Sequence, residues 1–235
     1  MAFLHTGQGR EPFLRAPTAV LALIGALVAA HVARMLMTTA ASERVVSEYA
    51  FIPLRYAPHA QEPGTLIERA IPFLGYMFIH ADVTHLAINC LWLLAFGSVV
   101  GRRFGGPMFV TFFVLCGAAA AAFYLALDWE SPGAMIGASG AISGLMAAGI
   151  RMVGPVAGSS PRRSLLPILS PQVVVFSGLW IAVNLALGFS GFSLAGEAQP
   201  IAWQAHLGGY FVGLFLAGPF DLWARRSGGD AQPSA

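Results

Sequence analysis

The chain has 235 residues, of which 57% are hydrophobic and only 10% are charged. A soluble domain normally carries about 25% charged residues to keep its surface hydrated, so this composition excludes an ordinary soluble enzyme, a coiled coil and a disordered chain. The thirteen basic residues are all Arg. The net charge of +2 is too small to indicate a nucleic-acid-binding protein. The composition therefore predicts an all-α, polytopic membrane protein.

Six apolar stretches follow one another along the chain, each close to the roughly 20 residues that a helix needs to cross a bilayer. The long connection after the first contains a further apolar run, 71–79, too short to span and expected at the membrane interface or packed against the bundle. We expect one six-helix membrane domain at 17–220, a cytoplasmic N-terminal segment at 1–16 and a disordered cytoplasmic tail at 221–235. The predicted spans are 17–37, 83–101, 107–127, 134–151, 165–189 and 199–220.

The distribution of Arg predicts the orientation of these spans. With the N-terminus in the cytoplasm, nine Arg fall on the cytoplasmic side and three, Arg44, Arg55 and Arg69, on the other, with Arg34 near the outer end of the first span. Cytoplasmic loops of membrane proteins carry an excess of Arg and Lys, so both termini are predicted to be cytoplasmic. The nine cytoplasmic residues are Arg10, Arg15, Arg102, Arg103, Arg151, Arg162, Arg163, Arg225 and Arg226.

One alternative concerns the first span. Arg10 and Arg15 precede an apolar run that reaches Val28-Ala29-Ala30, a pattern that resembles a secretory signal peptide. The run continues to Met37 without a clean cleavage site, so we expect the span to be retained. Cleavage would leave five spans and the same later loops.

Polar and titratable side chains inside a span are costly in lipid and therefore mark candidate functional sites. The second span contains His85 and Asn89, which lie four residues apart and hence on one face of a helix. Spacing alone equally allows both to hydrogen-bond neighbouring helices. The predicted spans carry no Asp or Glu at mid-depth, which excludes an aspartyl protease dyad and an H-E-x-x-H zinc protease. We expect neither a metal nor a cofactor.

The fourth span opens with Gly137-Ala138-Ser139-Gly140. A Ser between glycines at a helix start has an exposed hydroxyl beside backbone N–H groups that lack intrahelical partners. Such N–H groups suit an oxyanion that develops on a carbonyl attacked by the Ser. Taken alone, the same pattern also fits a Ser that only caps its helix.

The sixth span contains His206, three residues before the first glycine of a G-x-x-x-G pair, Gly209 and Gly213. Small residues also recur every four positions in the fourth span, at Gly140 and Gly144. Small faces let two helices approach at backbone distance, so the His206 imidazole is expected to reach the Ser139 hydroxyl. The residues of the sixth span are equally consistent with a helix-packing motif in which His206 only hydrogen-bonds a neighbouring helix. The remaining polar residues of the spans, Asn184 among them, are interpreted as interhelical hydrogen bonders.

The three motifs occur in order on alternate spans: His85-x-x-x-Asn89, then Gly137-Ala138-Ser139-Gly140, then Ala205-His206-x-x-Gly209-x-x-x-Gly213. In this combination the sequence resembles the rhomboid family of intramembrane serine proteases, from about residue 73 to residue 218. The resemblance implies a six-helix rhomboid-like bundle with a water-filled cavity open to the non-cytoplasmic side. It also implies transmembrane proteins as substrates and the lipid bilayer as environment.

The resemblance further implies a role for each residue of the motifs. Ser139 is similar in position to the nucleophile and His206 to its general base, in a dyad without an acidic member. His85 and Asn89 correspond to the side chains of the oxyanion hole, and His80 to a second upstream His with a supporting role. The supporting glycines are Gly137, Gly140, Gly209 and Gly213.

Two departures from the family pattern leave open which groups hold the dyad in place and which groups tether the outer loop. Ser143 stands where members often carry an aromatic ring against the catalytic His, and Ile71-Pro72 stands where many carry a Trp-Arg pair. We expect an intramembrane serine endopeptidase of the bacterial inner membrane. The alternatives are a catalytically silent rhomboid-like scaffold that binds membrane proteins, and a channel or transporter that uses His85 and His206 as a polar pathway.

Overall fold

Five helical stretches of the computed structural model are long and apolar enough to cross a membrane. The structure describes residues 16–60, 65–153, 164–190 and 202–229. These residues form helices, turns and one isolated β-bridge, and none of them forms a strand. The predicted all-α, polytopic bundle is confirmed. In the second stretch a π-helical turn, η3 (Leu93–Gly97), joins α5 (Val83–Trp92) to α6 (Ser98–Phe104). The other four are α1 (Thr18–Met35), α7 (Gly106–Leu127), α9 (Pro171–Ser190) and α10 (Trp203–Gly229).

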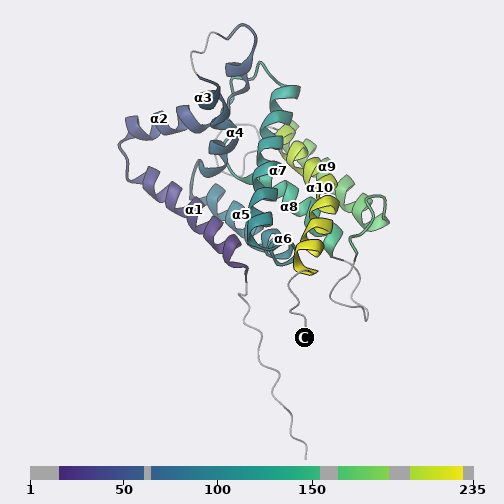
Figure 1. Cartoon of the computed structure of the whole chain (residues 1–235). Coiled ribbons are helices and arrows are strands. Elements are labelled where there is room, and N and C mark those ends of the chain that lie inside the picture. The colour runs from purple at the N-terminus through teal and green to yellow at the C-terminus, as the bar shows by residue number, and fades with distance from the viewer. Residues whose placement is uncertain (1–15, 61–64, 154–163, 191–201, 230–235) are drawn as a thin grey trace, which may run out of the picture.

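The remaining predicted span, 134–151, is the shorter helix α8 (Ser139–Met152), which packs against both α7 and α10 (Figure 1). Its 14 residues extend about 21 Å, less than the roughly 30 Å of a bilayer core. The helix begins five residues later than predicted because Gly137 has a φ of 101°, a left-handed conformation outside the α-helical region. Eleven of the fourteen residues are buried, so protein rather than lipid surrounds this helix.

The connection between the first two spans folds at one end of the bundle, opposite the start of α1 and the end of α10 (Figure 1). Its apolar run, 71–79, packs against the bundle: Tyr76 is buried and its hydroxyl donates to the Gly117 carbonyl of α7 at 2.9 Å. The elements of this connection are α2 (Thr39–Tyr49), η1 (Pro53–Tyr56), α3 (Leu66–Ala70), α4 (Pro72–Gly75) and η2 (Tyr76–Phe78).

Glycine lines the contact between α8 and α10. A Cβ placed on Gly209 would overlap the carbonyl oxygen of Gly140, and a Cβ on Gly213 would overlap that of Gly144. The two helices therefore meet backbone to backbone along this seam. Such an approach requires residues without a side chain on both helices, as the small-residue spacing in the sequence predicts.

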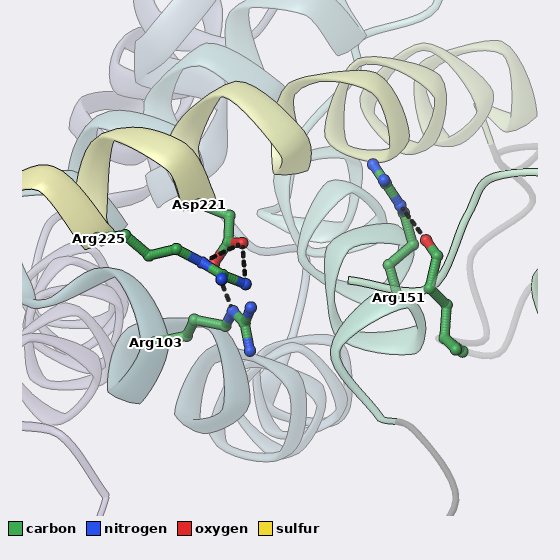
Figure 2. A network of polar contacts seen from close by, with 5 residues as sticks. Arg103, Arg151, Asp221 and Arg225 are labelled. Atoms are coloured by element: carbon green, nitrogen blue, oxygen red, sulfur yellow. Dashed lines mark hydrogen bonds and ion pairs between the residues drawn. The ribbon is translucent and has the colours of Figure 1, made fainter. Parts of the chain in front are cut away.

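At the opposite end from the long connection, Asp221 ties α10 to α6 (Figure 2). This carboxylate is buried, and it accepts hydrogen bonds from Arg103 Nε at 2.6 Å and from Arg225 Nε at 2.9 Å. The sequence predicted a disordered tail from residue 221, but α10 continues to Gly229. The charged turn stays helical because Asp221 is paired on both sides. Residues 1–15 and 230–235 lie outside the described part of the chain.

Arg151, predicted at the cytoplasmic end of the fourth span, is buried between helices (Figure 2). Its guanidinium donates to the Leu214 carbonyl of α10 at 2.7 Å and to the Leu166 carbonyl at 3.0 Å. Backbone carbonyls thus satisfy a cation that lipid would exclude. Two further Arg of the predicted cytoplasmic set, Arg162 and Arg163, lie outside the described residues.

Candidate active site

Ser139 is the first residue of α8, immediately after a tight turn. Gly137 makes this turn in its left-handed conformation, and its N–H donates to the Tyr76 carbonyl at 2.9 Å. A Cβ on Gly137 would lie 2.6 Å from His85 Nε2, so the turn touches the imidazole directly. The first N–H groups of a helix have no intrahelical acceptor, and the N–H of Ser139 is the first of these in α8.

His206 lies in the first turn of α10 and faces the start of α8. Its Nε2 is 2.8 Å from Ser139 Oγ, a hydrogen-bond distance. The glycine seam makes this distance possible because it brings the two helix backbones into contact. The structure therefore brings together the two residues that the sequence predicts as nucleophile and general base.

Asn184 of α9 contacts the other nitrogen of the same imidazole. Its Oδ1 is 2.7 Å from His206 Nδ1, and its Nδ2 donates to the Trp180 carbonyl at 2.9 Å. The Trp180 ring stacks over the imidazole, with centroids 6.4 Å apart and planes at 30°. The sequence patterns do not predict Asn184 or Trp180 as part of the site. The available signal was a carboxamide in the interior of an apolar stretch, 178–189, that has no other polar side chain except the indole of Trp180.

His85 and Asn89 lie one turn apart on α5. The Asp82 side chain caps this helix by accepting from the His85 N–H at 2.8 Å. Asn89 Nδ2 donates to the His85 carbonyl at 2.9 Å. A carboxamide has two N–H donors, so this bond occupies one of them and leaves the second for a ligand.

His80 and Arg34 fix the segment that leads into α5. His80 is fully buried, with its ring edge-on to that of His85 at a centroid distance of 5.2 Å. Burial, together with electrostatic repulsion by the nearby His85, His31 and Arg34 side chains, lowers the pKa of His80 to about 3, so this imidazole is neutral at neutral pH. Arg34 of α1 donates to the carbonyls of His80 and Ala81 and tethers the segment.

Ser143, where the family pattern often has an aromatic ring, is buried within α8. Its hydroxyl donates to the Ser139 carbonyl at 2.8 Å, a bond within the helix. The aromatic contact to the His206 imidazole comes from Trp180 on another helix. Position 143 thus has no aromatic ring, and Trp180 of α9 contacts the His206 imidazole instead.

One cavity of about 420 Å³ connects these side chains. Ser139, His206, His85 and Asn89 all line it, and most of the remaining wall is apolar. Residues of α8 and of the segment before it, 133–137, also line the cavity. Irregular backbone within a membrane protein is tolerated where it lines such a cavity. No group of three or more His, Cys, Asp or Glu among the described residues is placed to hold a metal ion.

The chain is similar to known proteins over more than half of its length. The family model described as Rhomboid domain matches residues 68–220. A curated relative, rhomboid protease GluP of Bacillus subtilis (strain 168), is 28% identical over 144 residues, which cover 61% of this chain. These residues correspond to 25% of the relative, so the chain spans about a quarter of that protein's length. The residues matched by the family model include His85, Asn89, Ser139 and His206.

Proposed function

The chain belongs to the rhomboid family, and on that premise we propose that it is an intramembrane serine endopeptidase. It hydrolyses peptide bonds in or near transmembrane segments of other membrane proteins. The observation that carries the proposal is the 2.8 Å contact between Ser139 Oγ and His206 Nε2 at the wall of the cavity. A hydroxyl paired with an imidazole is the arrangement that nucleophilic acyl transfer needs.

The first half of the reaction forms an acyl-enzyme. His206 Nε2 takes the proton of the Ser139 hydroxyl while Oγ attacks the substrate carbonyl carbon, and the carbonyl oxygen becomes an oxyanion. When this intermediate collapses, the C–N bond breaks and His206 returns the proton to the leaving amine. The Ser139 ester and one half of the substrate remain in the site.

The second half of the reaction consumes one water molecule. His206 takes a proton from the water as its oxygen attacks the ester carbon, and the second tetrahedral intermediate breaks the bond to Oγ. The proton then passes from His206 to Oγ, which restores the hydroxyl. Because lipid holds no water, the cavity has to connect to an aqueous phase, and we assign this opening to the non-cytoplasmic side.

Three groups stabilise the oxyanion in this proposal. The second N–H of the Asn89 carboxamide and the His85 imidazole approach from α5, and the Ser139 N–H approaches from the start of α8. Preorganised donors of this kind act strongly where water is scarce. The glycine at position 137 supports the arrangement because any side chain there would displace the His85 ring.

The chain is an integral membrane protein. We further place both termini in the cytoplasm and the protein in a bacterial inner membrane. Substrates are transmembrane segments that unwind near the outer membrane boundary, because a peptide bond within an intact helix is shielded from Oγ. Helix-breaking residues in the substrate favour this unwinding.

Covalent labelling with a fluorophosphonate, together with cleavage of a reporter transmembrane segment, tests the proposal. We expect the detergent-purified protein to be labelled and to cleave the reporter, and Ser139→Ala to do neither. Labelling of Ser139→Ala at the wild-type level would refute the assigned nucleophile. Absence of both signals in the wild-type protein would favour the silent scaffold.

A further inference from the structure

The helix α9 buries little of its surface, and this makes its one buried polar residue informative. Within α9, every residue of which the structure describes, only Val173 and Asn184 are buried. Its outer face is apolar, with Val175 and Leu179 each more than half exposed. A carboxamide on such a helix is costly in lipid unless it is hydrogen-bonded inside the protein.

The contacts of Asn184 determine which end of its carboxamide faces His206. One end contacts the Trp180 carbonyl, which can only accept, so that end is the NH₂ group. The opposite end, Oδ1, then faces His206 Nδ1 at 2.7 Å. An oxygen acceptor requires a donor, so Nδ1 carries the proton. In a neutral imidazole this leaves Nε2 with a lone pair directed at Ser139 Oγ, 2.8 Å away.

Trp180 holds the same ring from a second direction. It lies four residues before Asn184 on α9, and its indole is stacked over the imidazole at an interplanar angle of 30°. The hydrogen bond from Nδ1 fixes the rotation of the ring in its plane, and the stacked indole limits its tilt. Both groups come from α9, whereas the two reacting groups come from α8 and α10.

We propose that Asn184 is a positioning residue of the active site, which orients His206 within the Ser139–His206 dyad. Its carbonyl oxygen selects the imidazole tautomer that can accept the Ser139 proton and keeps Nε2 aimed at Oγ. The same oxygen stays bonded to Nδ1–H after protonation of Nε2, so the contact serves both the uptake and the return of the proton. The inference rests on the proposed protease function.

The experiment compares Asn184→Leu, Asn184→Asp and the exposed control Leu179→Ala on the same helix, with Ser139→Ala as the inactive reference. Asn184→Leu keeps the volume but removes the acceptor, and we expect kcat for the reporter segment to fall about 10²-fold, part of what a general base contributes. KM and the thermal midpoint should stay close to wild type, because the substrate and the helix packing do not depend on this bond.

The Asp variant separates orientation from packing. A carboxyl group accepts from Nδ1–H as the carboxamide does and, when protonated, also donates to the Trp180 carbonyl. We therefore expect Asn184→Asp to recover kcat to within about tenfold of wild type. Leu179→Ala should match wild type in all readouts. If Asn184→Leu keeps wild-type kcat while remaining folded, Asn184 has no positioning role.

A spectroscopic measurement on the wild-type protein covers the case in which the Leu variant does not fold. In protein with ¹⁵N-labelled His, the signals absent from His206→Gln belong to His206, and we expect them to report a proton on Nδ1. A proton on Nε2 would overturn the inference. Failure of wild type to cleave, or cleavage by Ser139→Ala, would instead overturn the protease proposal.

Discussion

Asn89 illustrates how a single carboxamide can be kept in place and still be available to a substrate. It is buried, one of its N–H groups is bound to the His85 carbonyl, and its Oδ1 has no hydrogen-bond partner among the described residues. The bond to the helix backbone fixes the rotamer. Because Asn89 also lines the cavity, the proposed role of its second N–H as an oxyanion donor needs no change of rotamer.

We predict that Asn89→Ala lowers kcat by about 10²–10³-fold and leaves KM nearly unchanged, because the donor acts on the oxyanion and not on the bound ground state. Folding should change little, since the carboxamide contributes one bond within its own helix. Steady-state cleavage of the reporter segment measures both parameters. Leu91→Ala, a substitution of an exposed residue on the same helix, is the matched control. A kcat within twofold of wild type would exclude Asn89 from the oxyanion hole.

The residues of the site differ in how far the sequence predicts them. Ser139 and His206 each stand in a short pattern of glycines, and these patterns also predict the close approach of their helices. Asn184 and Arg34 have no such local pattern. Their contacts depend on how α9 and α1 dock, which is decided by packing between segments far apart in the chain. A sequence pattern therefore predicts the place of a residue in the site only when its neighbours in the chain determine that place.

At the scale of helices, the glycine seam between α8 and α10 determines the geometry of the dyad. Gly213 lies two turns after His206, and a Cβ there would overlap Gly144. A methyl group forces the helix axes apart, and cores packed at native density adjust to such insertions only with strain. Any separation at Gly213 is transmitted along α10 to the contact between Nε2 and Oγ.

We predict that Gly213→Ala lowers the thermal midpoint in detergent and reduces fluorophosphonate labelling. Overpacking of this kind costs about 1–3 kcal/mol. The matched controls are Gly25→Ala on α1 and Gly178→Ala on α9, where nothing lies within 4 Å of the added Cβ. Both controls should keep or slightly raise the midpoint, because Ala is the better helix former. A Gly213→Ala midpoint equal to that of the controls would contradict a backbone contact at this seam.

Hydropathy predicts that each apolar helix exists better than it predicts the residue at which the helix begins. The predicted span 107–127 agrees with α7 to within one residue at each end, but α8 and α9 begin five and six residues after the predicted starts of their spans. An apolar segment has the same hydropathy whether it is helical or extended, and for α8 the conformation of Gly137 decides where the helix begins. The helix α10 continues beyond residue 220, the end of its predicted span, and the pairing of Asp221 with Arg103 there is a contact between distant segments.

At the scale of the whole molecule, Arg residues are divided between the two ends of the bundle. Arg44, Arg55 and Arg69 lie in the connection that contains α2 and α3. Arg103 and Arg225 meet around Asp221 at the opposite end, where α1 starts and α10 ends (Figures 1 and 2). With Arg102 of α6 and Arg226 of α10, four of the described Arg lie at the end where α1 starts and α10 ends, against the three of the connection at the other end. The positive-inside rule assigns the end with more cations to the cytoplasm.

This orientation predicts which positions a membrane-impermeant maleimide can reach. In a background in which Cys90 and Cys116 are replaced by Ala, single cysteines are introduced at Glu43 of α2 and at Arg226 of α10, both exposed. In bacterial spheroplasts, we expect Glu43→Cys to react from outside and Arg226→Cys to react only after the membrane is permeabilised. Because the cavity must receive water and substrate from outside in the proposed mechanism, the reverse labelling pattern would place the active site on the cytoplasmic side.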